Sequence, residues 1–223
     1  MRTPKDWAFQ PPTGRVIIGV DEVGLGPIAG PIAACAVVLK PGTDRMGFAH
    51  VDDSKKLNEQ TRETLARTLQ DRTHWSVAWV EVPEYERLGH DAAHQQALRR
   101  ATEETIRRAV HLSGRDPRNL LVVVDGNRHI DGGVRYDTTP IEQLALVKAD
   151  SRCLEVAMAS ILAKHLRDRR MIELDAIWPW FGFARHKGYG TEAHVAALRE
   201  HGPCPEHRPR PTHNVLAKKG VTP

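Results

Sequence analysis

The sequence is poor in cysteine and in aromatic residues, and it contains no long apolar run. Its three cysteines, Cys35, Cys153 and Cys204, are odd in number and far apart, which indicates neither a disulfide framework nor a zinc site. Aromatic residues make up only 5% of the chain, so the core should be mainly aliphatic. No segment is long enough to span a membrane, and the N-terminus lacks a signal-type apolar run. We therefore expect a cytoplasmic protein without a membrane partner.

Size and charge are typical of one soluble globular domain. The chain has 223 residues, of which 40% are hydrophobic and 27% charged. The net charge is +4, and much of the positive excess falls late in the chain, which permits a nucleic-acid partner without requiring one. Residues 1–14 contain prolines and no periodic pattern, so we expect a flexible N-terminal arm. The basic run from Arg208 to Lys219 is typical of a solvated tail.

Hydrophobic patterning predicts a mixed sheet covered by helices. Three strands joined by short links should form an antiparallel meander at residues 16–20, 32–39 and 75–82, the last ended by Pro83. Two further apolar runs lie at residues 120–124 and 144–147. Helices are predicted over residues 61–69, capped by Ser54 or Asn58, over 91–112, and directly after a cap at Asp150 or Ser151. A short helix should follow and end near residue 198.

Three of the apolar runs end in carboxylates, namely Asp21 with Glu22, Asp125 and Asp150. If these strands are neighbours, the carboxylates converge at one edge of the sheet, where like charges repel one another. Divalent cations remove that cost, and two of them about 4 Å apart suit in-line phosphodiester displacement. Taken singly, Asp150 could merely cap a helix and Asp125 could begin a turn. Their combination with Asp21 and Glu22 favours a metal site.

A glycine-rich loop follows the first acidic pair and brings bare backbone close to any ligand. Gly24, Gly26 and Ala29 also match the dinucleotide-binding fingerprint. That interpretation would place two carboxylates against a pyrophosphate without a cation between them. Pro31 would also remove a donor from the helix that the fingerprint requires, and strand-like sequence continues instead. The match is accidental on these grounds.

Two basic segments suit a nucleic-acid partner. Arg185-His-Lys-Gly-Tyr189 places basic groups and an aromatic ring on a glycine-broken loop, which suits contact with a backbone and stacking on a sugar or base. An ordinary basic surface loop with a packed tyrosine explains the same residues equally well. Lys55 and Lys56 fit phosphate contacts as well as a solvated helix start.

Taken together, these motifs resemble the type 2 ribonuclease H family, also called ribonuclease HII. The resemblance runs from about residue 16 to about residue 208, with the motifs in the family's order. They are Asp21-Glu-Val-Gly-Leu-Gly-Pro-Ile-Ala-Gly-Pro31, Asp53-Ser-Lys-Lys-Leu57, Val124-Asp-Gly-Asn127, Lys148-Ala-Asp150, Ala159-Ser-Ile-Leu-Ala-Lys164 with Arg167-Asp168, Phe183-Ala-Arg-His-Lys-Gly-Tyr-Gly-Thr191 and His201-Gly-Pro203.

The resemblance implies an α/β ribonuclease H-like fold, with a mixed five-stranded sheet flanked by helices and a C-terminal helical extension. Residues 15–223 would form this catalytic domain, including the extension and the basic tail. It also implies an endonuclease that cuts the RNA strand of RNA–DNA hybrids and cuts at ribonucleotides embedded in duplex DNA. The expected cofactors are two divalent cations, Mg²⁺ or Mn²⁺, and the expected products carry 5′-phosphate and 3′-hydroxyl ends. We expect a monomer.

The family's site residues transfer position by position. The implied metal ligands and catalytic residues are Asp21, Glu22, Asp125 and Asp150. The implied substrate-binding residues are Gly24, Leu25, Gly26, Lys55, Lys164, His186, Lys187 and Tyr189. Within the second set, the two glycines would offer backbone to the ribose 2′-hydroxyl, Tyr189 would pack against a sugar on the DNA side, and the basic residues would contact phosphates.

Two departures from the family pattern leave other interpretations open. Leu25 stands where the family usually has arginine, and Pro209-Arg-Pro211 replaces its usual sequence after His207-Arg208. The first suggests an alternative, a catalytically weak or inactive nucleic-acid-binding protein of the same fold. A more distant alternative is a metal-dependent phosphatase with a small substrate. Retention of all four acids favours the enzyme, and the basic aromatic loop favours nucleic acid.

Overall fold

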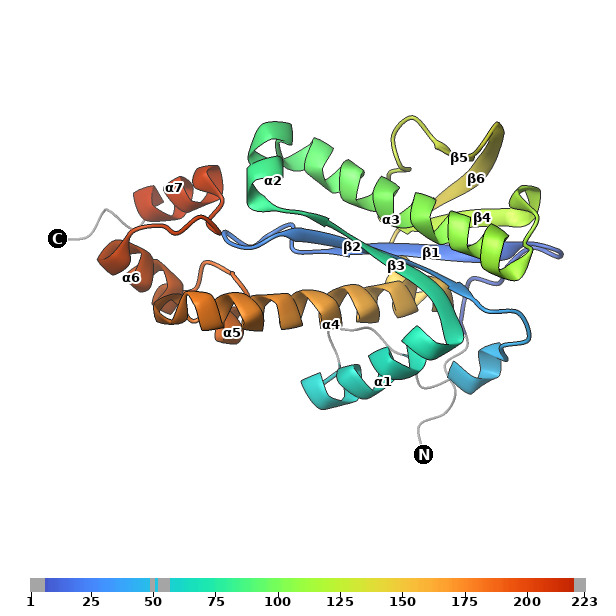
Figure 1. Cartoon of the computed structure of the whole chain (residues 1–223), viewed down its shortest axis with the longest axis horizontal. Coiled ribbons are helices and arrows are strands. Elements are labelled where there is room, and N and C mark those ends of the chain that lie inside the picture. Colours follow the sequence, from blue (N-terminus) through green and yellow to red (C-terminus); the bar gives the residue numbers. More distant parts are fainter. Residues whose placement is uncertain (1–6, 49–50, 52–56, 219–223) are drawn as a thin grey trace.

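The computed structural model describes residues 7–48, 51 and 57–218. Within them a twisted sheet is sandwiched between helices, and a group of helices extends from one end (Figure 1). The sheet has six strands, not the expected five, in the order β3-β2-β1-β4-β6-β5. The strands are β1 (Val16–Val23), β2 (Ile32–Leu39), β3 (Thr73–Val80), β4 (Leu120–Asp125), β5 (Val134–Tyr136) and β6 (Thr139–Leu146). The unexpected strand, β5, has only three residues, too few for a recognisable apolar pattern.

The strand β1 lies at the centre of the sheet. It pairs antiparallel with β2, and β2 pairs antiparallel with β3, so the predicted meander is confirmed. On its other side β1 pairs parallel with β4, and β4 pairs parallel with β6. Because parallel strands end at the same edge of a sheet, the ends of β1, β4 and β6 lie together, as the acidic motifs required.

Two long helices cover the two faces of the sheet (Figure 1). The helix α3 (His90–Ser113) packs on the face that carries Ile18 and Val122, and α4 (Leu154–Ile177) packs on the opposite face. Gly19 explains how closely α4 approaches β1. A Cβ atom at this position would lie 2.1 Å from the backbone carbonyl carbon of Glu155, so only glycine fits.

The shorter helices test the predicted start and stop signals. The helix α1 (Glu59–Arg72) begins at Asn58, whose side chain accepts from the Thr61 N–H at 2.8 Å, as one of the two predicted caps required. The other candidate, Ser54, lies outside the described residues. The helix α4 is present as predicted, but its predicted cap is wrong, because Asp150 and Ser151 lie in a separate 3₁₀ turn, Ala149–Ser151, and Cys153 precedes the helix. Pro83 ends no strand but occupies the first turn of an unexpected helix, α2 (Val82–Leu88), where proline is well tolerated.

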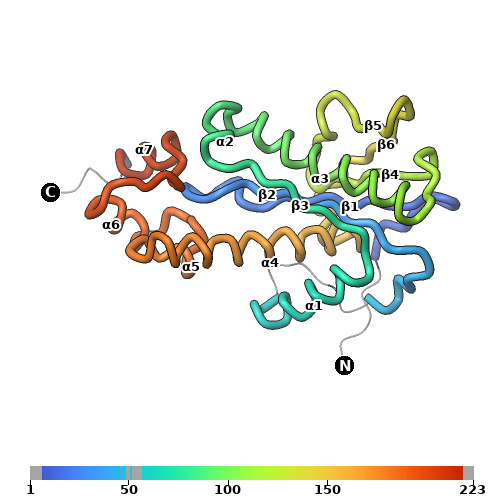
Figure 2. Tube along the Cα trace, viewed as in Figure 1, coloured from blue at the N-terminus to red at the C-terminus, as the bar shows by residue number. Residues whose placement is uncertain are grey.

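The C-terminal extension is helical, as expected. The helices α5 (Phe183–His186), α6 (Glu192–His201) and α7 (Pro209–Lys218) gather around the far end of α4 (Figure 2). We call residues 178–218 the C-terminal lobe. The expectation of a solvated tail from Arg208 is wrong within this lobe, because α7 is a helix and the Arg208 side chain is fully buried.

The described part of the N-terminal segment also contacts the domain. The Trp7 side chain is buried in an apolar cluster with α4 residues, and the Phe9 N–H donates to the Arg152 carbonyl at 2.9 Å. At these two residues the segment is packed, which differs from the flexible arm that its composition predicted.

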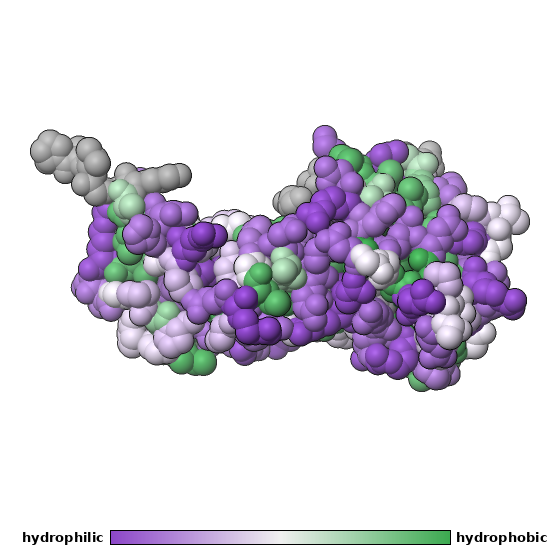
Figure 3. Space-filling view, turned by 90° about the horizontal axis from the view of Figure 1, so that it is seen from above, coloured by the Kyte–Doolittle hydropathy of each residue, from purple (hydrophilic) through white to green (hydrophobic). Residues whose placement is uncertain are grey.

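The surface seen from above is mainly hydrophilic, with small hydrophobic patches, and its outline is indented between the C-terminal lobe and the body (Figure 3). In the part of the chain that the structure describes, no helix combines the length and the apolar character needed to cross a membrane.

Candidate active site

Asp21 and Asp125 lie side by side where the pairing of β1 with β4 ends. Val20 is opposite Val124 in the register of these strands, so the two aspartates that follow continue as neighbours on one face. Asp21 is buried beneath α4, with an exposed fraction of 6%. Its Oδ1 accepts from the Glu22 N–H at 2.8 Å, and its carboxylate also hydrogen-bonds to the Ser160 side chain on α4. The strand and the helix together fix this carboxylate.

Asp125 connects the end of β4 to the turn that carries Asp150. Its Oδ1 accepts from the Ala149 N–H at 2.6 Å, and the Gly126 N–H gives it a second backbone hydrogen bond. Asp150, the next residue after Ala149, is buried with an exposed fraction of 7%. The backbone hydrogen bond therefore places the third and fourth acids next to each other.

Glu22 extends toward the other face of the sheet. The strand β1 continues through Val23, so adjacent side chains alternate in direction at the acidic pair. The Glu22 Oε2 atom lies 3.3 Å from the Nε2 atom of His94 on α3. Asp21 is thus held by hydrogen bonds on the α4 side of the sheet, whereas Glu22 lies on the α3 side beside His94.

The charges of these carboxylates influence one another. The pKa of Asp21 lies well above its usual value because of burial, and the negative charges of Glu22 and Asp125 raise it further. Burial also raises the pKa of Asp125, with additional contributions from the charges of Asp150 and Glu22. Like charges held together in this way are stabilised by a bound cation, and carboxylate oxygens are the ligands that Mg²⁺ and Mn²⁺ prefer.

The four acids fit a divalent cation in donor type and charge, although their side chains do not yet converge. Among residues 7–48, 51 and 57–218, no three His, Cys, Asp or Glu side chains are already close enough to enclose a metal ion. Glu22 and Asp125 are partly exposed, whereas Asp21 and Asp150 are buried.

The glycine turn and Tyr189 form a second part of the site. A Cβ atom on Gly26 would lie 3.6 Å from the Cε1 atom of Tyr189, so the ring lies against bare backbone. Tyr189 is 47% exposed and can meet a ligand. Gly24 has a φ of +92°, and a side chain there would collide with the Arg167 side chain and the Pro31 carbonyl. The structure therefore brings together Gly24, Gly26 and Tyr189, as the motifs predicted.

Leu25, between the two glycines, is oriented differently from an expected substrate contact. It is partly buried and packs against the apolar cluster between the sheet and α3. The Leu25 side chain therefore packs beneath the turn, and a substrate on the turn would meet mainly backbone atoms.

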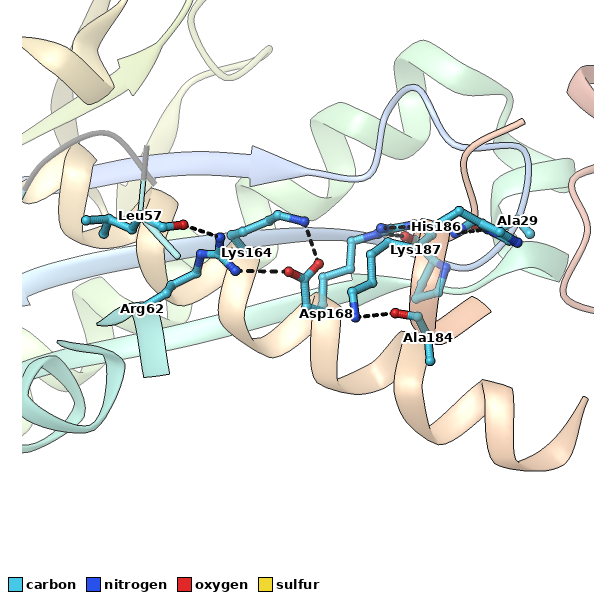
Figure 4. A network of polar contacts seen from close by, with 11 residues as sticks. Ala29, Leu57, Arg62, Lys164, Asp168, Ala184, His186 and Lys187 are labelled. Carbon is cyan, nitrogen blue, oxygen red and sulfur yellow. Dashed lines mark hydrogen bonds and ion pairs between the residues drawn. The ribbon is translucent and has the colours of Figure 1, made fainter. Parts of the chain in front are cut away.

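Three of the predicted basic residues, Lys164, His186 and Lys187, lie on α4 and in the segment after it, and each has a protein partner (Figure 4). The Lys164 Nζ lies 2.5 Å from Asp168 Oδ1, and the Asp168 Oδ2 lies 3.2 Å from Arg62. The Lys187 Nζ donates to the Ala184 carbonyl at 2.6 Å. Both lysines are partly exposed and can exchange these partners for a phosphate. Lys55, the remaining predicted lysine, lies outside the described residues.

His186 does not fulfil its predicted role as a phosphate contact. Its ring is buried, with Nε2 2.7 Å from the Phe181 carbonyl oxygen and Nδ1 accepting from the Gly188 N–H at 3.3 Å. The ring also stacks on His194, with centroids 4.2 Å apart. Both nitrogens are occupied, so His186 stabilises the C-terminal lobe instead.

Four residues near the site received no role from the sequence: His94, Ser160, Arg167 and Arg208. Ser160 and Arg167 belong to motifs that carried the family resemblance, and this was the available signal for them. For His94, nothing in its helical segment distinguishes it from the other polar residues of α3. Arg208 was assigned to a basic tail because its neighbours are also basic and proline-rich.

The sequence of this chain is similar to those of known proteins. The family model for Ribonuclease HII matches residues 18–215. A ribonuclease HII of Xanthomonas campestris pv. campestris is 41% identical over 204 residues, which cover 91% of this chain and 78% of the relative.

Solved structures of similar proteins share the fold. A ribonuclease H2 from Pyrococcus horikoshii OT3 superposes with a TM-score of 0.72 at 24% identity, covering 91% of this chain and 98% of that one. The structure of Bst-RNase HIII in complex with Mn²⁺ superposes with a TM-score of 0.67 at 20% identity, covering 93% of this chain and 71% of that one. At these identities the likeness establishes the fold.

Proposed function

This chain belongs to the ribonuclease HII family, and from that premise we propose how its own residues cut nucleic acid. It is a metal-dependent endoribonuclease that hydrolyses the RNA strand of RNA–DNA hybrids. We further propose that it cuts at single ribonucleotides embedded in duplex DNA, leaving 5′-phosphate and 3′-hydroxyl ends. The observation that carries the proposal is that Asp21 and Asp125 are neighbours on adjacent strands, close enough to Glu22 and Asp150 that burial and the neighbouring carboxylates raise the pKa values of both aspartates.

Asp21, Glu22, Asp125 and Asp150 would hold Mg²⁺ or Mn²⁺. When bound, two such cations supply Lewis-acid chemistry that lowers the pKa of an attacking water and stabilises the departing 3′-oxygen. The protein's part is to hold the carboxylates in place. Ser160 fixes Asp21 from α4, and the Ala149 N–H fixes Asp125 from the turn before α4.

His94 would hold Glu22 before the cations bind. Its ring lies within 3.3 Å of the glutamate, so it can keep this carboxylate at the strand end until metal and substrate arrive. Glu22 would then serve as a metal ligand together with Asp21, Asp125 and Asp150.

The glycine turn and Tyr189 would recognise the ribonucleotide. The exposed backbone of Gly26 would meet a ribose 2′-hydroxyl, which is the group that distinguishes RNA from DNA. Gly24 is buried beside it, and its carbonyl already accepts from Arg208, so it would act mainly by shaping the turn. The Tyr189 ring, lying against Gly26, would pack on the adjoining sugar. Lys164 and Lys187 would contact the phosphates on the same side of α4. Because the turn uses backbone donors, Leu25 does not prevent recognition of the hydroxyl.

Cleavage of a labelled RNA–DNA hybrid tests this proposal. The protein is incubated with the hybrid in Mg²⁺, in Mn²⁺ and in a chelator, beside all-RNA and all-DNA duplexes of the same sequence. We expect cutting of the RNA strand only with metal, and 3′-hydroxyl products that a DNA polymerase can extend. Tight binding to the hybrid without cutting would instead support the catalytically weak nucleic-acid-binding protein suggested by Leu25. Hydrolysis of a small phosphate ester without hybrid cutting would support the phosphatase. Cytoplasmic location and a monomeric state stay predictions from the sequence.

A further inference from the structure

Arg208 is a fully buried arginine whose guanidinium makes five hydrogen bonds to carbonyls of the glycine loop. It also hydrogen-bonds to Tyr85 on α2 and lies 4.8 Å from the centroid of that ring. Its guanidinium donates to the carbonyl of Gly24 at 2.7 Å, to Leu25 at 3.2 Å, to Pro27 at 3.1 Å and twice to Gly30, at 2.7 and 2.9 Å. A planar guanidinium with five fixed donors can serve several carbonyls at once, which a lysine ammonium with three donors cannot. One side chain from the C-terminal lobe therefore sets the shape of a loop that lies near the other end of the sequence.

The backbone around Arg208 adds a second attachment to the same loop. The Gly30 N–H donates to the Glu206 carbonyl at 2.8 Å, and the Arg208 N–H donates to the Ile28 carbonyl at 2.8 Å. Ala29 and His207 thus form an antiparallel β-bridge. Since the backbone and the Arg208 side chain both hold the loop, its position depends on where residues 206–208 lie.

His207, the neighbour of Arg208, reaches in the other direction, toward Tyr189. The His207 Nε2 lies 3.0 Å from the His194 Nε2, and the His194 Nδ1 lies 2.9 Å from the Tyr189 carbonyl oxygen. The His207 Nδ1 accepts from the Cys204 N–H at 3.0 Å. A carbonyl only accepts, so His194 must donate from Nδ1 and accept at Nε2 from His207. These bonds assign both tautomers and need both rings neutral.

Arg167 and Gly188 connect the two loops directly. The Ile28 and Ala29 N–H groups donate to the Gly188 carbonyl at 2.9 and 3.2 Å. Arg167 on α4 donates to the carbonyls of Lys187 and Ala29, at 3.0 and 3.2 Å. The loop that carries Tyr189 is therefore attached to the glycine loop at its base, and His207 with Arg208 braces both from behind.

We propose that His207 and Arg208 act as a pair of positioning residues that set the distance between the Gly24–Gly26 turn and Tyr189. In this way they determine how well the enzyme distinguishes a ribonucleotide from a deoxyribonucleotide. The inference rests on the proposed function, in which that turn meets the 2′-hydroxyl and Tyr189 meets the adjoining sugar. Both positioning residues are buried, so they act through the two loops and not by touching the substrate.

A change in the distance between the Gly24–Gly26 turn and Tyr189 should weaken binding of a ribonucleotide-containing duplex much more than binding of an all-DNA duplex. Only a 2′-hydroxyl needs donors and acceptors placed to within a fraction of an ångström, and displacements of about 1 Å cost roughly a hundredfold in comparable systems. Attraction of an all-DNA duplex depends mainly on lysine and arginine contacts with phosphates, which tolerate such shifts. The ratio of the two affinities is therefore the sensitive quantity.

Arg208→Lys is the main test, because it keeps the positive charge and removes the fork of donors. The matched control is Arg210→Lys, the same change at an exposed position two residues further along. Binding is measured on a duplex with one ribonucleotide and on the all-DNA duplex, in calcium to prevent cutting, together with single-turnover cleavage in magnesium. We expect Arg208→Lys to reduce the ratio of the two affinities by roughly tenfold to a hundredfold, while its affinity for all-DNA duplex stays within about twofold of wild type. Arg210→Lys should leave the ratio unchanged.

A merely structural role predicts a different result. Arg208→Lys would then lower the unfolding temperature but keep the wild-type ratio of affinities, and this outcome would overturn the inference. If Arg208→Lys does not fold, His207→Gln decides the question by the same ratio, since it leaves Arg208 in place and breaks the connection to Tyr189. Retention of the wild-type ratio in that variant would equally overturn the inference.

Amide hydrogen exchange separates this inference from the proposed function. In Arg208→Lys, we expect faster exchange in both residues 24–30 and residues 187–190, because the first loop loses its brace and is hydrogen-bonded to the second through Gly188. If wild type itself shows no preference for the ribonucleotide duplex, the proposed function fails, and exchange still reports whether the pair couples the loops. Faster exchange in only one of the two segments would contradict the coupling.

Discussion

Asp125→Asn separates catalysis from folding and from substrate binding. Asparagine has nearly the same shape as aspartate, and its side-chain oxygen can still accept from the Ala149 N–H, which lies 2.6 Å from the Asp125 Oδ1. The turn that carries Asp150 should therefore stay in place. What changes is the charge, because one of four carboxylates becomes neutral.

The expected effects follow from that lost charge. Removing one preorganised charged group from the transition state costs about 3–4 kcal/mol, which slows cleavage at least roughly a hundredfold. In the absence of metal, the loss of this charge should not destabilise the folded protein. Burial and the charges of Asp150 and Glu22 raise the pKa of Asp125, so its ionised form destabilises the folded protein at neutral pH. Asparagine cannot ionise, so the variant should unfold at the same temperature as wild type or at a higher one in a chelator.

Single-turnover cleavage, hybrid binding and thermal unfolding measure these effects on one preparation. Magnesium should raise the unfolding temperature of wild type and raise that of Asp125→Asn much less. Binding to the hybrid should change by no more than about twofold, because the phosphate contacts remain. Asp71→Asn, at an exposed aspartate on α1, is the control for the substitution itself. Near-normal turnover of Asp125→Asn, or a lower unfolding temperature in the chelator, would refute the reasoning.

Four further predictions test other parts of the structure. Calcium should permit binding of the hybrid but support little cutting, because its longer and looser ligand bonds position the water poorly; equal rates in calcium and magnesium would count against two-metal catalysis. Gly19→Ala should cost about 3 kcal/mol or more in urea unfolding, since the new Cβ would lie 2.1 Å from the Glu155 backbone. The pKa values of His194 and His207 are lowered from 6.5 to about 4 by burial, so the folded state resists protons that the unfolded chain binds. The free energy of unfolding should therefore have its full value above pH 6.5 and fall by about 2 kcal/mol per histidine by about pH 5. The fall should be smaller in His207→Gln, which keeps only one of these two histidines. Leu25→Ala should cost about 1 kcal/mol of stability, because the side chain packs on the apolar cluster between the sheet and α3; wild-type stability of the variant would contradict that packing.

Local patterns predicted the central part of the fold because they depend on few residues. The apolar run at 16–20, the cap at Asn58 and the helical spacing over 91–112 each reflect the geometry of one element, and each was confirmed. The same logic brought the acidic motifs to one edge, because parallel strands end together. Short elements such as β5 and α2 carry too few residues to produce a period.

Charge was a poor guide to exposure in the C-terminal lobe. Arg208 is basic and lies in a proline-rich stretch, yet it is buried because carbonyls of the distant glycine loop accept five hydrogen bonds from its guanidinium. His186 was predicted to contact phosphate from its place in a basic loop, whereas the fold packs its ring against His194. In both cases the partner lies on another element, and a pattern read along the chain does not contain it.

Cleavage of a DNA duplex that carries one ribonucleotide tests the central claim most directly. The protein is compared on this duplex and on the all-DNA duplex of the same sequence, in magnesium, in manganese and in a chelator. We predict one cut beside the ribonucleotide, with 5′-phosphate and 3′-hydroxyl ends, only when metal is present and only in the first duplex. Equal treatment of both duplexes, or cutting that persists in the chelator, would contradict a metal-dependent site that recognises the 2′-hydroxyl.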